Sequence, residues 1–370
     1  MIRVIISGGG TGGHVFPAIA IANAIRGKVP DSEILFIGAN GKLEMEKVPA
    51  AGYPIHGLWI SGLQRRLTWK NLSFPLKVIF SLMKASQIIN RFKPDIVIGV
   101  GGYASGPTLR AAIRKKIPTL IQEQNSYPGI TNKLLGKKVT KICVAYEGME
   151  RFFPKNKILF TGNPVRQDIL SIRNKRKDGL LNFGLKEDKK VILILGGSLG
   201  AGTINRSVLN CVRKGITEKG CQILWQTGKF YFDNTIANLE ISTNPDVHVV
   251  AFIDRMDLAY ASADIVISRA GAIAISELCI AGKPVLLIPS PNVAEDHQTK
   301  NAQALERTGS AIMIKDWEAE ERLFQKLNEL LEDQHLQKLL HENISRLAIP
   351  DAADRIADEA LQMTTNYSIH

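Results

Sequence analysis

The sequence predicts an α/β protein built from two Rossmann-like domains, each with a doubly wound parallel sheet. A strand, a glycine loop and a helix follow one another twice, once near residues 4–14 and again near residues 191–204. Short apolar runs rich in β-branched residues alternate with amphipathic segments, as in parallel sheets covered by helices on both faces. The length of 370 residues also favours two domains, because single cores rarely grow beyond about 250 to 300 residues.

The apolar runs mark the expected strands in chain order. In the first half they are residues 4–6, 34–37, 96–100, 119–122 and 141–144. In the second half they are residues 191–195, 223–225, 248–251, 265–268 and 285–288. We place an N-terminal domain at 1–164 and a C-terminal domain at 165–346. In 347–370 a helix follows Pro350, and we expect it to pack back on the first domain. A ligand would then lie in the cleft between the domains, outside the carboxyl ends of the strands.

The first glycine loop reads Ser7-Gly8-Gly9-Gly10-Thr11-Gly12-Gly13-His14. Glycines allow a tight turn with positive φ, and the start of the following helix offers unpaired N–H groups to an anion or to sugar oxygens. His14 is a candidate general base for a bound hydroxyl group, because its unperturbed pKa lies near neutrality. The alternative is a histidine that only caps the tight turn.

The same glycines also match the dinucleotide fingerprint. A nicotinamide-binding domain normally has an acidic residue at the end of its second strand, whereas this strand ends in Gly38-Ala39-Asn40. The loop also lacks the Gly-Lys-Ser/Thr of NTPase phosphate loops. Both features disfavour hydride transfer and NTP hydrolysis. Protein incubated with NADH would reveal the oxidoreductase alternative by fluorescence.

A better nucleotide site is predicted in the second half. The strand at 265–268 is followed by the turn Arg269-Ala270-Gly271-Ala272, and then by a helix over 273–280 that Gly282 closes. A diphosphate fits the N-terminus of such a helix. Glu277, about one turn further along, can accept hydrogen bonds from both hydroxyls of a ribose. The alternative is an ordinary solvated carboxylate on the helix surface.

Positive charge is concentrated in the first half. Residues 1–165 hold 23 Lys/Arg against 8 Asp/Glu, a net charge of +15, and the remainder hold 24 against 27, a net charge of −3. Lys70, Lys77 and Lys84 recur every seven residues in the apolar segment 69–84. This pattern fits docking on an anionic membrane surface. The alternative is a buried helix face with solvated lysines, and we find no nucleic-acid motif.

No apolar run reaches the roughly 18 residues of a spanning helix, so we expect a protein that can touch a membrane without crossing it. With the basic apolar segment, this leads us to expect a peripheral protein on the cytoplasmic face of the membrane. The spacing of Cys143, Cys211, Cys221 and Cys279 matches neither a metal site nor a disulfide framework, which suits a reducing cytosol. We expect these cysteines to be packing residues.

Six motifs, taken together and in order, resemble one family. They are Gly9-Gly10-Thr11-Gly12-Gly13-His14, Gly101-Gly102-Tyr103-Ala104-Ser105-Gly106-Pro107, Glu123-Gln124-Asn125, Gly162-Asn163-Pro164-Val165-Arg166, Gly196-Gly197-Ser198-Leu199-Gly200-Ala201 and Arg269-Ala270-Gly271-Ala272-Ile273-Ala274-Ile275-Ser276-Glu277. The set resembles the MurG family of peptidoglycan N-acetylglucosaminyltransferases. The resemblance extends over nearly the whole chain and includes Asp296-His297-Gln298.

The resemblance implies a GT-B glycosyltransferase fold. It also implies transfer of N-acetylglucosamine (GlcNAc) from UDP-GlcNAc to the C4 hydroxyl of N-acetylmuramic acid (MurNAc) in undecaprenyl-pyrophosphoryl-MurNAc-pentapeptide, with inversion. By family analogy, the nucleotide diphosphate would contact Arg166, Ser198, Ile253, Ala272, Ile273 and Glu277. Around the transferred sugar would lie Thr11, Gly12, Gly13, Asn125 and Gln298. The acceptor-side candidates are Gly102, Tyr103 and Glu123, and His14 is the favoured base or else orients the acceptor diphosphate.

The chain contains no Asp-x-Asp, so we predict neither a metal nor a cofactor. Two positions depart from the family pattern: Gln122 stands where some relatives have His, and Leu199 replaces a common Gln. Either change could adjust substrate contacts. Two other functions stay open at this point, a GT-B glycolipid synthase that uses diacylglycerol and a non-catalytic nucleotide-sugar-binding protein. An assay with labelled donor and exchanged acceptors separates them.

Overall fold

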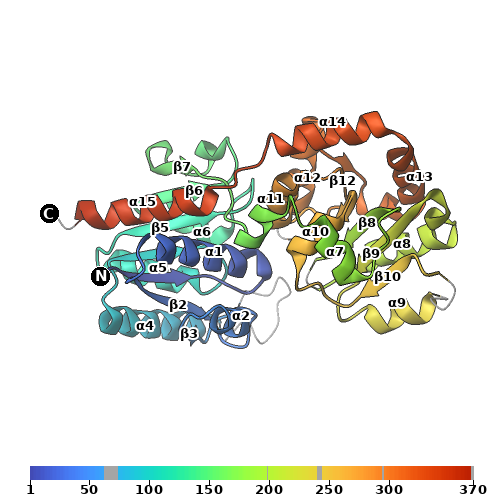
Figure 1. The fold of residues 1–370 in the computed structure, drawn as a ribbon. Helices are drawn as coiled ribbons and strands as arrows, with labels where there is room; N and C mark the ends of the chain where they lie inside the picture. Colours follow the sequence, from blue (N-terminus) through green and yellow to red (C-terminus); the bar gives the residue numbers. More distant parts are fainter. Residues whose placement is uncertain (62–73, 198, 240–243, 294–295, 368–370) are drawn as a thin grey trace. The chain divides into compact units, whose positions relative to one another are not determined.

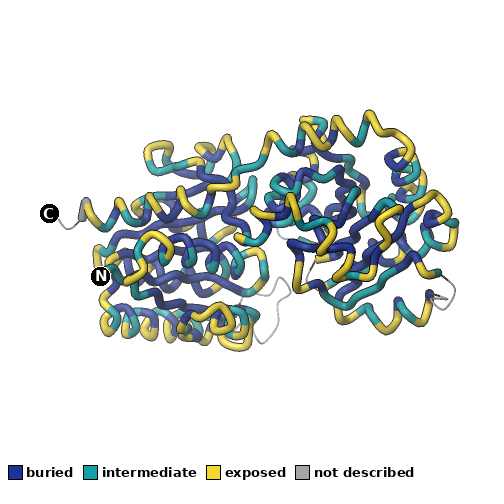
Figure 2. The backbone as a smooth tube through the Cα atoms, in the orientation of Figure 1, coloured by how far each residue is buried: buried dark blue, intermediate teal, exposed yellow. Residues whose placement is uncertain are grey.

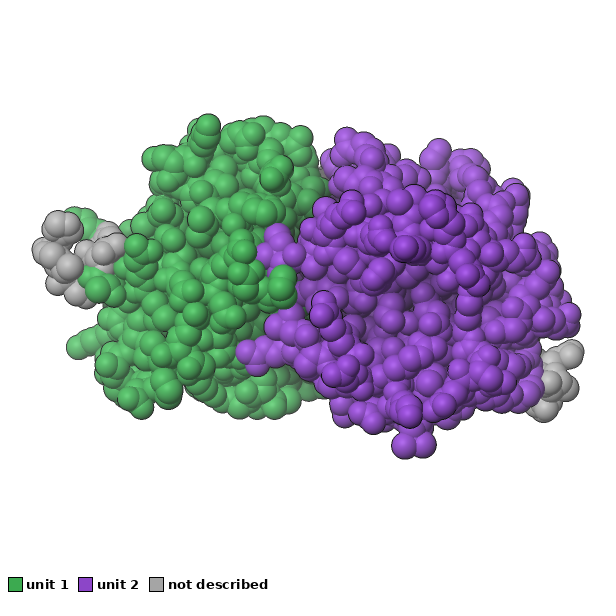
Figure 3. Space-filling view, turned by 45° about the horizontal axis from the view of Figure 1, so that its top comes forward, with its two compact units in different colours: residues 1–166, 350–370 green, residues 167–349 purple. Residues whose placement is uncertain are grey.

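The structure is a computed structural model that describes residues 1–61, 74–197, 199–239, 244–293 and 296–367. It divides into two compact units, coloured separately in Figure 3. Unit 1 comprises residues 1–166 and 350–370, and unit 2 comprises residues 167–349. Each unit contains one parallel sheet with helices on both faces (Figure 1). The predicted α/β class with two doubly wound domains is therefore confirmed.

The sheet of unit 1 has the strand order β3-β2-β1-β4-β5-β6-β7. Its strands are β1 (Arg3–Ser7), β2 (Glu33–Ala39), β3 (Ile55–Leu58), β4 (Ile96–Gly99), β5 (Thr119–Glu123), β6 (Lys141–Val144) and β7 (Ile158–Phe160). Its helices are α1 (Gly12–Lys28), α2 (Glu44–Ala50), α4 (Phe74–Phe92), α5 (Ser105–Arg114), α6 (Ile130–Gly136) and α15 (Ala352–Tyr367), with short 3₁₀ turns η1 (Met149–Arg151) and η2 (Lys155–Lys157).

Consecutive residues of the central strand face opposite sides of this sheet. Val4 and Ile6 pack with α1 and α15 in one core cluster, whereas Ile5 packs with α4, α5 and α6 in another. This alternation follows from the two-residue repeat of a strand, and it explains why the strands read as continuous apolar runs. Figure 2 shows the strands as the buried interior of the unit, with exposed residues on the outer surfaces of the helices.

Helix α15 is part of unit 1 although residues 167–349 separate it from the other elements of that unit. It packs against α1, and its buried residues Ile356, Ala357 and Ala360 join the core of that face. Lys28 of α1 also forms an ion pair with Asp358 at 2.8 Å. The helix that follows Pro350 thus packs on one face of the sheet of unit 1.

The sheet of unit 2 has the strand order β10-β9-β8-β11-β12-β13. Its strands are β8 (Lys190–Leu195), β9 (Cys221–Gln226), β10 (Val247–Val250), β11 (Ile265–Ser268), β12 (Val285–Leu287) and β13 (Ile312–Met313). Its helices are α7 (Arg176–Phe183), α8 (Gly202–Arg213), α9 (Phe232–Asn238), α10 (Met256–Ser262), α11 (Ala272–Ala281), α12 (His297–Arg307), α13 (Ala319–Glu332) and α14 (Gln334–Ser345), with 3₁₀ turns η3 (Gln167–Ser171), η4 (Ile216–Lys219) and η7 (Asp316–Glu318).

The second sheet is also covered on both faces. One core cluster joins Leu193 and Val266 to residues of α10 and α11, and the other joins Ile192 and Ile267 to residues of α8 and α13. Among the helices that the structure describes, none is both long and apolar enough to cross a bilayer.

Candidate active site

The predicted site residues follow the carboxyl ends of adjacent strands in each unit. In unit 1, β1, β4 and β5 are neighbours, and each is followed by one of the predicted motifs. In unit 2, the neighbouring strands β8, β11 and β12 and the nearby β10 precede the other motifs. Because parallel strands end at the same edge of a sheet, each unit collects its candidate residues at one edge. Each half-site is described by itself below.

The first glycine loop joins β1 to α1 through glycines that other residues could not replace. Gly9 and Gly10 have φ values of +145° and +95°, and helix α1 begins at Gly12 after the extended Thr11. Gly102 approaches the loop so closely that a Cβ there would lie 2.2 Å from the carbonyl oxygen of Gly9. The predicted strand, loop and helix start are therefore confirmed.

Glu44 holds this loop in place, and the sequence analysis missed it. Its side chain is 1% exposed. One carboxylate oxygen accepts the Gly10 N–H at 2.8 Å, and the other accepts the Ala39 N–H at 2.9 Å. A Cβ at Gly9 would lie 2.1 Å from the Glu44 carboxyl carbon. The Gly10 N–H is thus occupied from within the protein, and an incoming anion would have to use the N–H groups at the start of α1.

His14 lies in the first turn of α1 with its ring half-buried. Its Nδ1 lies 3.3 Å from the Thr11 hydroxyl oxygen. If Nδ1 carries the hydrogen and donates it to Thr11, Nε2 is left unprotonated and can accept a proton. The opposite tautomer makes Nε2 a donor. The hydroxyl of Thr11 can pair with either tautomer, because it both donates and accepts. The contact fixes the position of the ring, and the direction of this hydrogen bond decides whether Nε2 accepts or donates.

Gly101 leaves room for the His14 ring. A Cβ at Gly101 would lie 2.9 Å from Nε2, and the residue has φ = +90°. If His14 is the base, Gly101→Ala should displace the imidazole and lower turnover by up to about 100-fold, since small misplacements of a reacting group can have effects of that size. Gly148→Ala is the matched control, because Gly148 has φ = +74° and open space around it. Equal activity of the two variants in a transfer assay would contradict a catalytic placement of His14.

Tyr103 lies beside the same loop. Its ring is 48% exposed, and a Cβ at Gly10 would lie 3.9 Å from it. The structure thus brings His14, Tyr103 and the loop glycines together at the ends of β1 and β4. Gly102 itself packs against the loop, so the role that the structure gives it is a close backbone approach.

Glu123 is the last residue of β5 and lies beneath the loop that follows this strand. Its carboxylate is 1% exposed and accepts four hydrogen bonds, from the N–H groups of Asn125 and Gly129 and from the side chains of Asn125 and Asn132, at 2.8–3.3 Å. Burial raises the pKa of this carboxyl, and the hydrogen bonds oppose that shift. With all four bonds made inside the protein, Glu123 positions the half-buried Asn125 and the exposed loop residue Gly129.

Gln122, one of the two departures from the family pattern, is completely buried. Its amide nitrogen donates to the Asn163 side chain at 3.0 Å, and Asn163 donates to the Gln124 carbonyl at 3.1 Å. The departure at position 122 therefore changes a hydrogen-bond network inside the protein. Its buried side chain presents no group to a substrate. Arg166 comes shortly after Asn163 in the sequence. Its guanidinium carbon lies 5.3 Å from the centre of the Phe16 ring.

The second glycine loop joins β8 to α8 in unit 2. Gly197 and Gly200 have positive φ, and a Cβ at Gly200 would lie 2.1 Å from the Thr227 carbonyl oxygen. Leu199, the other departure, is 82% exposed. Ser198, a predicted nucleotide contact, lies outside the described residues. The loop and the helix that follows it match the prediction.

Gln226 links two of the predicted nucleotide-binding segments and was not predicted. It ends β9 and is 4% exposed. Its amide nitrogen donates to the Gly197 carbonyl at 3.1 Å, and its amide oxygen accepts the Ile253 N–H at 2.9 Å. Since that N–H is engaged, any contact from Ile253 to a nucleotide would have to come from its carbonyl group or side chain.

Glu277 lies in the second turn of α11, which begins directly after Gly271. It is 5% exposed, so the alternative of a solvated helix carboxylate is wrong. The Tyr260 hydroxyl lies 3.3 Å from one of its oxygens and donates to it. Ala272 and Ile273, the first two residues of α11, are also buried, so the groups that they can offer to a diphosphate are their backbone N–H groups.

Gln298 lies in the first turn of α12. Its side-chain oxygen accepts the Ser290 N–H at 2.9 Å and thereby holds the segment that follows β12. This bond leaves the amide nitrogen of Gln298 and the second lone pair of its oxygen as the groups that it can offer to a sugar.

Within the described ranges, no group of three or more His, Cys, Asp or Glu side chains could hold a metal ion. Burial raises the pKa of the Cys143, Cys211 and Cys279 thiols to about 12, as expected for packing residues.

Helix α4 presents apolar side chains to solvent. Slightly more than half of the surface is exposed in Leu76, Ile79, Phe80 and Met83, and in the neighbouring Trp59. We call these five residues the α4 patch. The face of α4 turned to the core consists of Ser81, Ala85 and Ile89, with Val78, Leu82 and Ile88 partly buried. The alternative of an ordinary buried apolar face is thus wrong for the residues of the patch.

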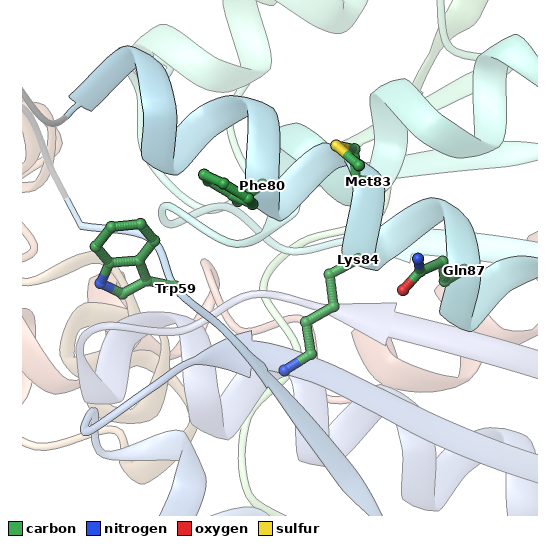
Figure 4. Close-up of a pocket in the computed structure, with 5 residues that line it drawn as sticks. All are labelled: Trp59, Phe80, Met83, Lys84 and Gln87. Atoms are coloured by element: carbon green, nitrogen blue, oxygen red, sulfur yellow. The ribbon is translucent and has the colours of Figure 1, made fainter.

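Three residues of the α4 patch line a pocket of about 420 Å³ together with Lys84 and Gln87 (Figure 4). The three are Trp59, Phe80 and Met83. Lys84 donates to the Gly57 carbonyl at 2.8 Å, and Lys77 donates to the Ser61 hydroxyl at 3.1 Å. These two lysines therefore tie α4 to the segment that carries Trp59. Lys70, the third lysine of the predicted series, lies outside the described residues.

Comparisons with known proteins cover almost the whole chain. Residues 4–144 match the glycosyltransferase family 28 N-terminal domain, and residues 191–356 match its C-terminal domain. The chain is 56% identical to a UDP-N-acetylglucosamine–N-acetylmuramyl-(pentapeptide) pyrophosphoryl-undecaprenol N-acetylglucosamine transferase of Cytophaga hutchinsonii, over 98% of this chain and 96% of that protein. It is 53% identical to the protein of the same name from Christiangramia forsetii, over 99% and 98%.

Among solved structures, Acinetobacter baumannii MurG has a similar fold. The TM-score is 0.77 at 28% sequence identity, and the match covers 98% of this chain and 100% of that one. The similarity thus includes both sheets and the segments that follow their strands.

Proposed function

Because the chain belongs to the family of UDP-N-acetylglucosamine–N-acetylmuramyl-(pentapeptide) pyrophosphoryl-undecaprenol N-acetylglucosamine transferases, we propose that it catalyses this transfer. It takes GlcNAc from UDP-GlcNAc to the C4 hydroxyl of MurNAc in the lipid-linked pentapeptide, with inversion at the sugar. The observation that carries the proposal is the 56% identity over 98% of the chain to a relative of that name. The buried Glu277 at the start of α11 supports the donor half of it.

Unit 2 would hold the donor. The N–H groups at the start of α11 and the dipole of that helix favour the diphosphate. Glu277 accepts hydrogen bonds from the ribose, and Ile253, Ala272 and Ile273 contribute backbone contacts. Ser198 and Gln298 complete the contacts of unit 2 that the family resemblance implies, and the same resemblance adds Arg166, the last residue of the first segment of unit 1.

Unit 1 would act on the acceptor. The C4 hydroxyl oxygen of MurNAc attacks C1 of GlcNAc, and its proton passes to Nε2 of His14. The bond between C1 and the β-phosphate oxygen breaks, and UDP leaves with the electron pair. Preorganised N–H donors and the Arg166 guanidinium stabilise the charge that develops on UDP. Tyr103 and Asn125 border the acceptor and the transferred sugar.

An assay with labelled UDP-GlcNAc tests the reaction. We expect label to enter the undecaprenyl-linked MurNAc-pentapeptide and free UDP to form in equal amount. Diacylglycerol supplied in place of that acceptor should remain unlabelled. Label in the diacylglycerol would favour a glycolipid synthase, and donor binding without UDP release in the presence of either acceptor would favour a non-catalytic binding protein.

The same function requires access to a lipid-linked acceptor, and the α4 patch offers a means of reaching it. We propose that the patch docks unit 1 on an anionic bilayer at the cytoplasmic face of the membrane. Apolar side chains that are half exposed in water can enter the interface of a bilayer. The net charge of +15 over residues 1–165 attracts anionic headgroups, with about 1 kcal/mol available for each cation near the surface.

Removing apolar area from the patch tests this docking. We expect Ile79→Ser combined with Phe80→Ser to weaken binding to vesicles that contain anionic lipid by about 10- to 100-fold. Each side chain is already about half buried, so the two together can bury about as much new area as one large apolar side chain, which is worth about 1.5–3 kcal/mol. The control is Leu181→Ser, since Leu181 is 85% exposed in unit 2. Binding of the parent should also weaken with added salt, as charges are screened over about 10 Å at 0.1 M.

Vesicle sedimentation of folded variants provides the measurement. Equal binding by the double variant and its parent would show that the patch does not enter the bilayer. Replacement of Lys77 and Lys84 by Glu is a second variant, with an effect expected to be larger at low salt. Their hydrogen bonds to Ser61 and Gly57 make it less selective than the serine variant.

A further inference from the structure

A carboxylate that is to bind a ribose must be held in one orientation. Glu277 is 5% exposed, and a carboxylate at such a position needs hydrogen-bond donors to offset its lost hydration. The Tyr260 hydroxyl supplies one of them, at 3.3 Å from one oxygen of Glu277. A contact to a single oxygen of the carboxylate restricts its rotation and thereby directs the other oxygen.

Tyr260 is itself fixed. It belongs to α10, in which every residue from Met256 to Ser262 is buried, and its own exposure is 0%. The ring lies in the core cluster that contains Val266 and Leu278. The phenol cannot move away from Glu277 without disturbing this core, so its hydroxyl is a fixed point beside the carboxylate.

The start of α10 is also anchored. Asp257 is 1% exposed and accepts hydrogen bonds from Arg255 and Lys175 at 2.9–3.0 Å. The Arg255 guanidinium, followed by Lys175, holds the pKa of Asp257 far below its usual range. Asp257 therefore remains an ionised anchor for α10, and the helix presents Tyr260 at a set distance from α11.

We propose that Tyr260 is a positioning residue for the donor, which orients the Glu277 carboxylate toward the two hydroxyls of the ribose. The inference rests on the proposed role of Glu277 as the ribose acceptor. It makes Tyr260 part of the preference for a ribonucleotide, although the tyrosine itself does not touch the ligand.

Calorimetry with two probes, UDP and 2′,3′-dideoxyuridine 5′-diphosphate, tests the two roles separately. The parent protein should bind UDP more tightly than the dideoxy probe. We expect Tyr260→Phe to weaken UDP binding by about threefold to tenfold, the loss that corresponds to a modest hydrogen bond, and to leave binding of the dideoxy probe unchanged. In steady-state assays KM for UDP-GlcNAc should rise with kcat retained.

Tyr53→Phe is the matched control. Tyr53 is also a buried tyrosine, and its hydroxyl donates to Asn23 in unit 1 at 2.7 Å. This variant should bind both probes as the parent does. A general structural effect of Tyr260→Phe would instead weaken both probes equally, and that result would overturn the positioning role.

A double variant shows whether Tyr260 acts through Glu277. If Tyr260 acts through Glu277, Tyr260→Phe should have no further effect on UDP binding once Glu277→Ala is present. Additive losses, or an unchanged preference for UDP in Tyr260→Phe alone, would overturn the proposal and leave the role of Glu277 intact. A parent protein that binds both probes equally would remove Glu277 from the ribose site, and Tyr260 with it.

Discussion

Replacing His14 with alanine should lower the turnover of GlcNAc transfer by roughly 10²- to 10⁴-fold, the usual share of general acid–base catalysis. UDP binding should survive, because the imidazole belongs to unit 1 and the predicted ribose acceptor to unit 2. The hydroxyl of Thr11, 3.3 Å from Nδ1, gives the ring a defined orientation. The variant removes both the proposed proton acceptor and this orientation. Steady-state kinetics with labelled donor, together with UDP titration, provide the measurements.

His335→Ala is the control, since His335 is exposed on α14. It should retain full activity. Near-normal turnover of a folded His14→Ala protein would show that the histidine only caps the loop. An effect confined to KM for the acceptor would assign His14 to acceptor orientation instead of proton transfer.

Replacing Glu277 with alanine should weaken UDP-GlcNAc binding by about 1.5–3 kcal/mol, the range for hydrogen bonds that involve a charged group. The side chain is almost completely buried in the second turn of α11. Its removal eliminates the proposed acceptor for the ribose hydroxyls and takes this partner from the Tyr260 hydroxyl. Isothermal titration calorimetry with UDP-GlcNAc measures the change.

The comparison for Glu277 is Glu321→Ala, which removes an exposed carboxylate from helix α13 of the same unit. Donor affinity should be the same in this variant as in the parent. An equally small change in Glu277→Ala would remove Glu277 from the donor site and would transfer ribose recognition to another residue.

The central strands could be predicted from the sequence because both faces of each sheet are covered. Strands such as β1, β8 and β11 then become apolar runs that are followed by glycine within three residues. Three edge strands, β3, β7 and β13, were missed. Ile55–Leu58 reads Ile-His-Gly-Leu, and Ile312–Met313 has only two residues. Such segments pair because a neighbouring strand lies beside them, and no local pattern marks them.

The same distinction applies to the candidate site. Glycine loops are local features, and so is a carboxylate one turn into a helix, which is why the loops and Glu277 could be selected. Glu44 could not be selected in this way. The nearby Glu46 is also a carboxylate on the same helix, and yet it is exposed. Gln226 and Tyr260 likewise act on segments 17 to 29 residues away. Their roles depend on the folded arrangement and leave no signal in neighbouring residues.

The discontinuity of unit 1 sets an order for folding during synthesis. Domains generally fold as units while the chain emerges from the ribosome. Unit 2 is made from one continuous segment, whereas the surface of α1 that receives Ile356, Ala357 and Ala360 stays uncovered until residues 350–367 have been made. The nascent chain therefore carries an incomplete first domain throughout translation of the second. Apolar surface on α1 is available to chaperones in that interval, and the late arrival of α15 ends it.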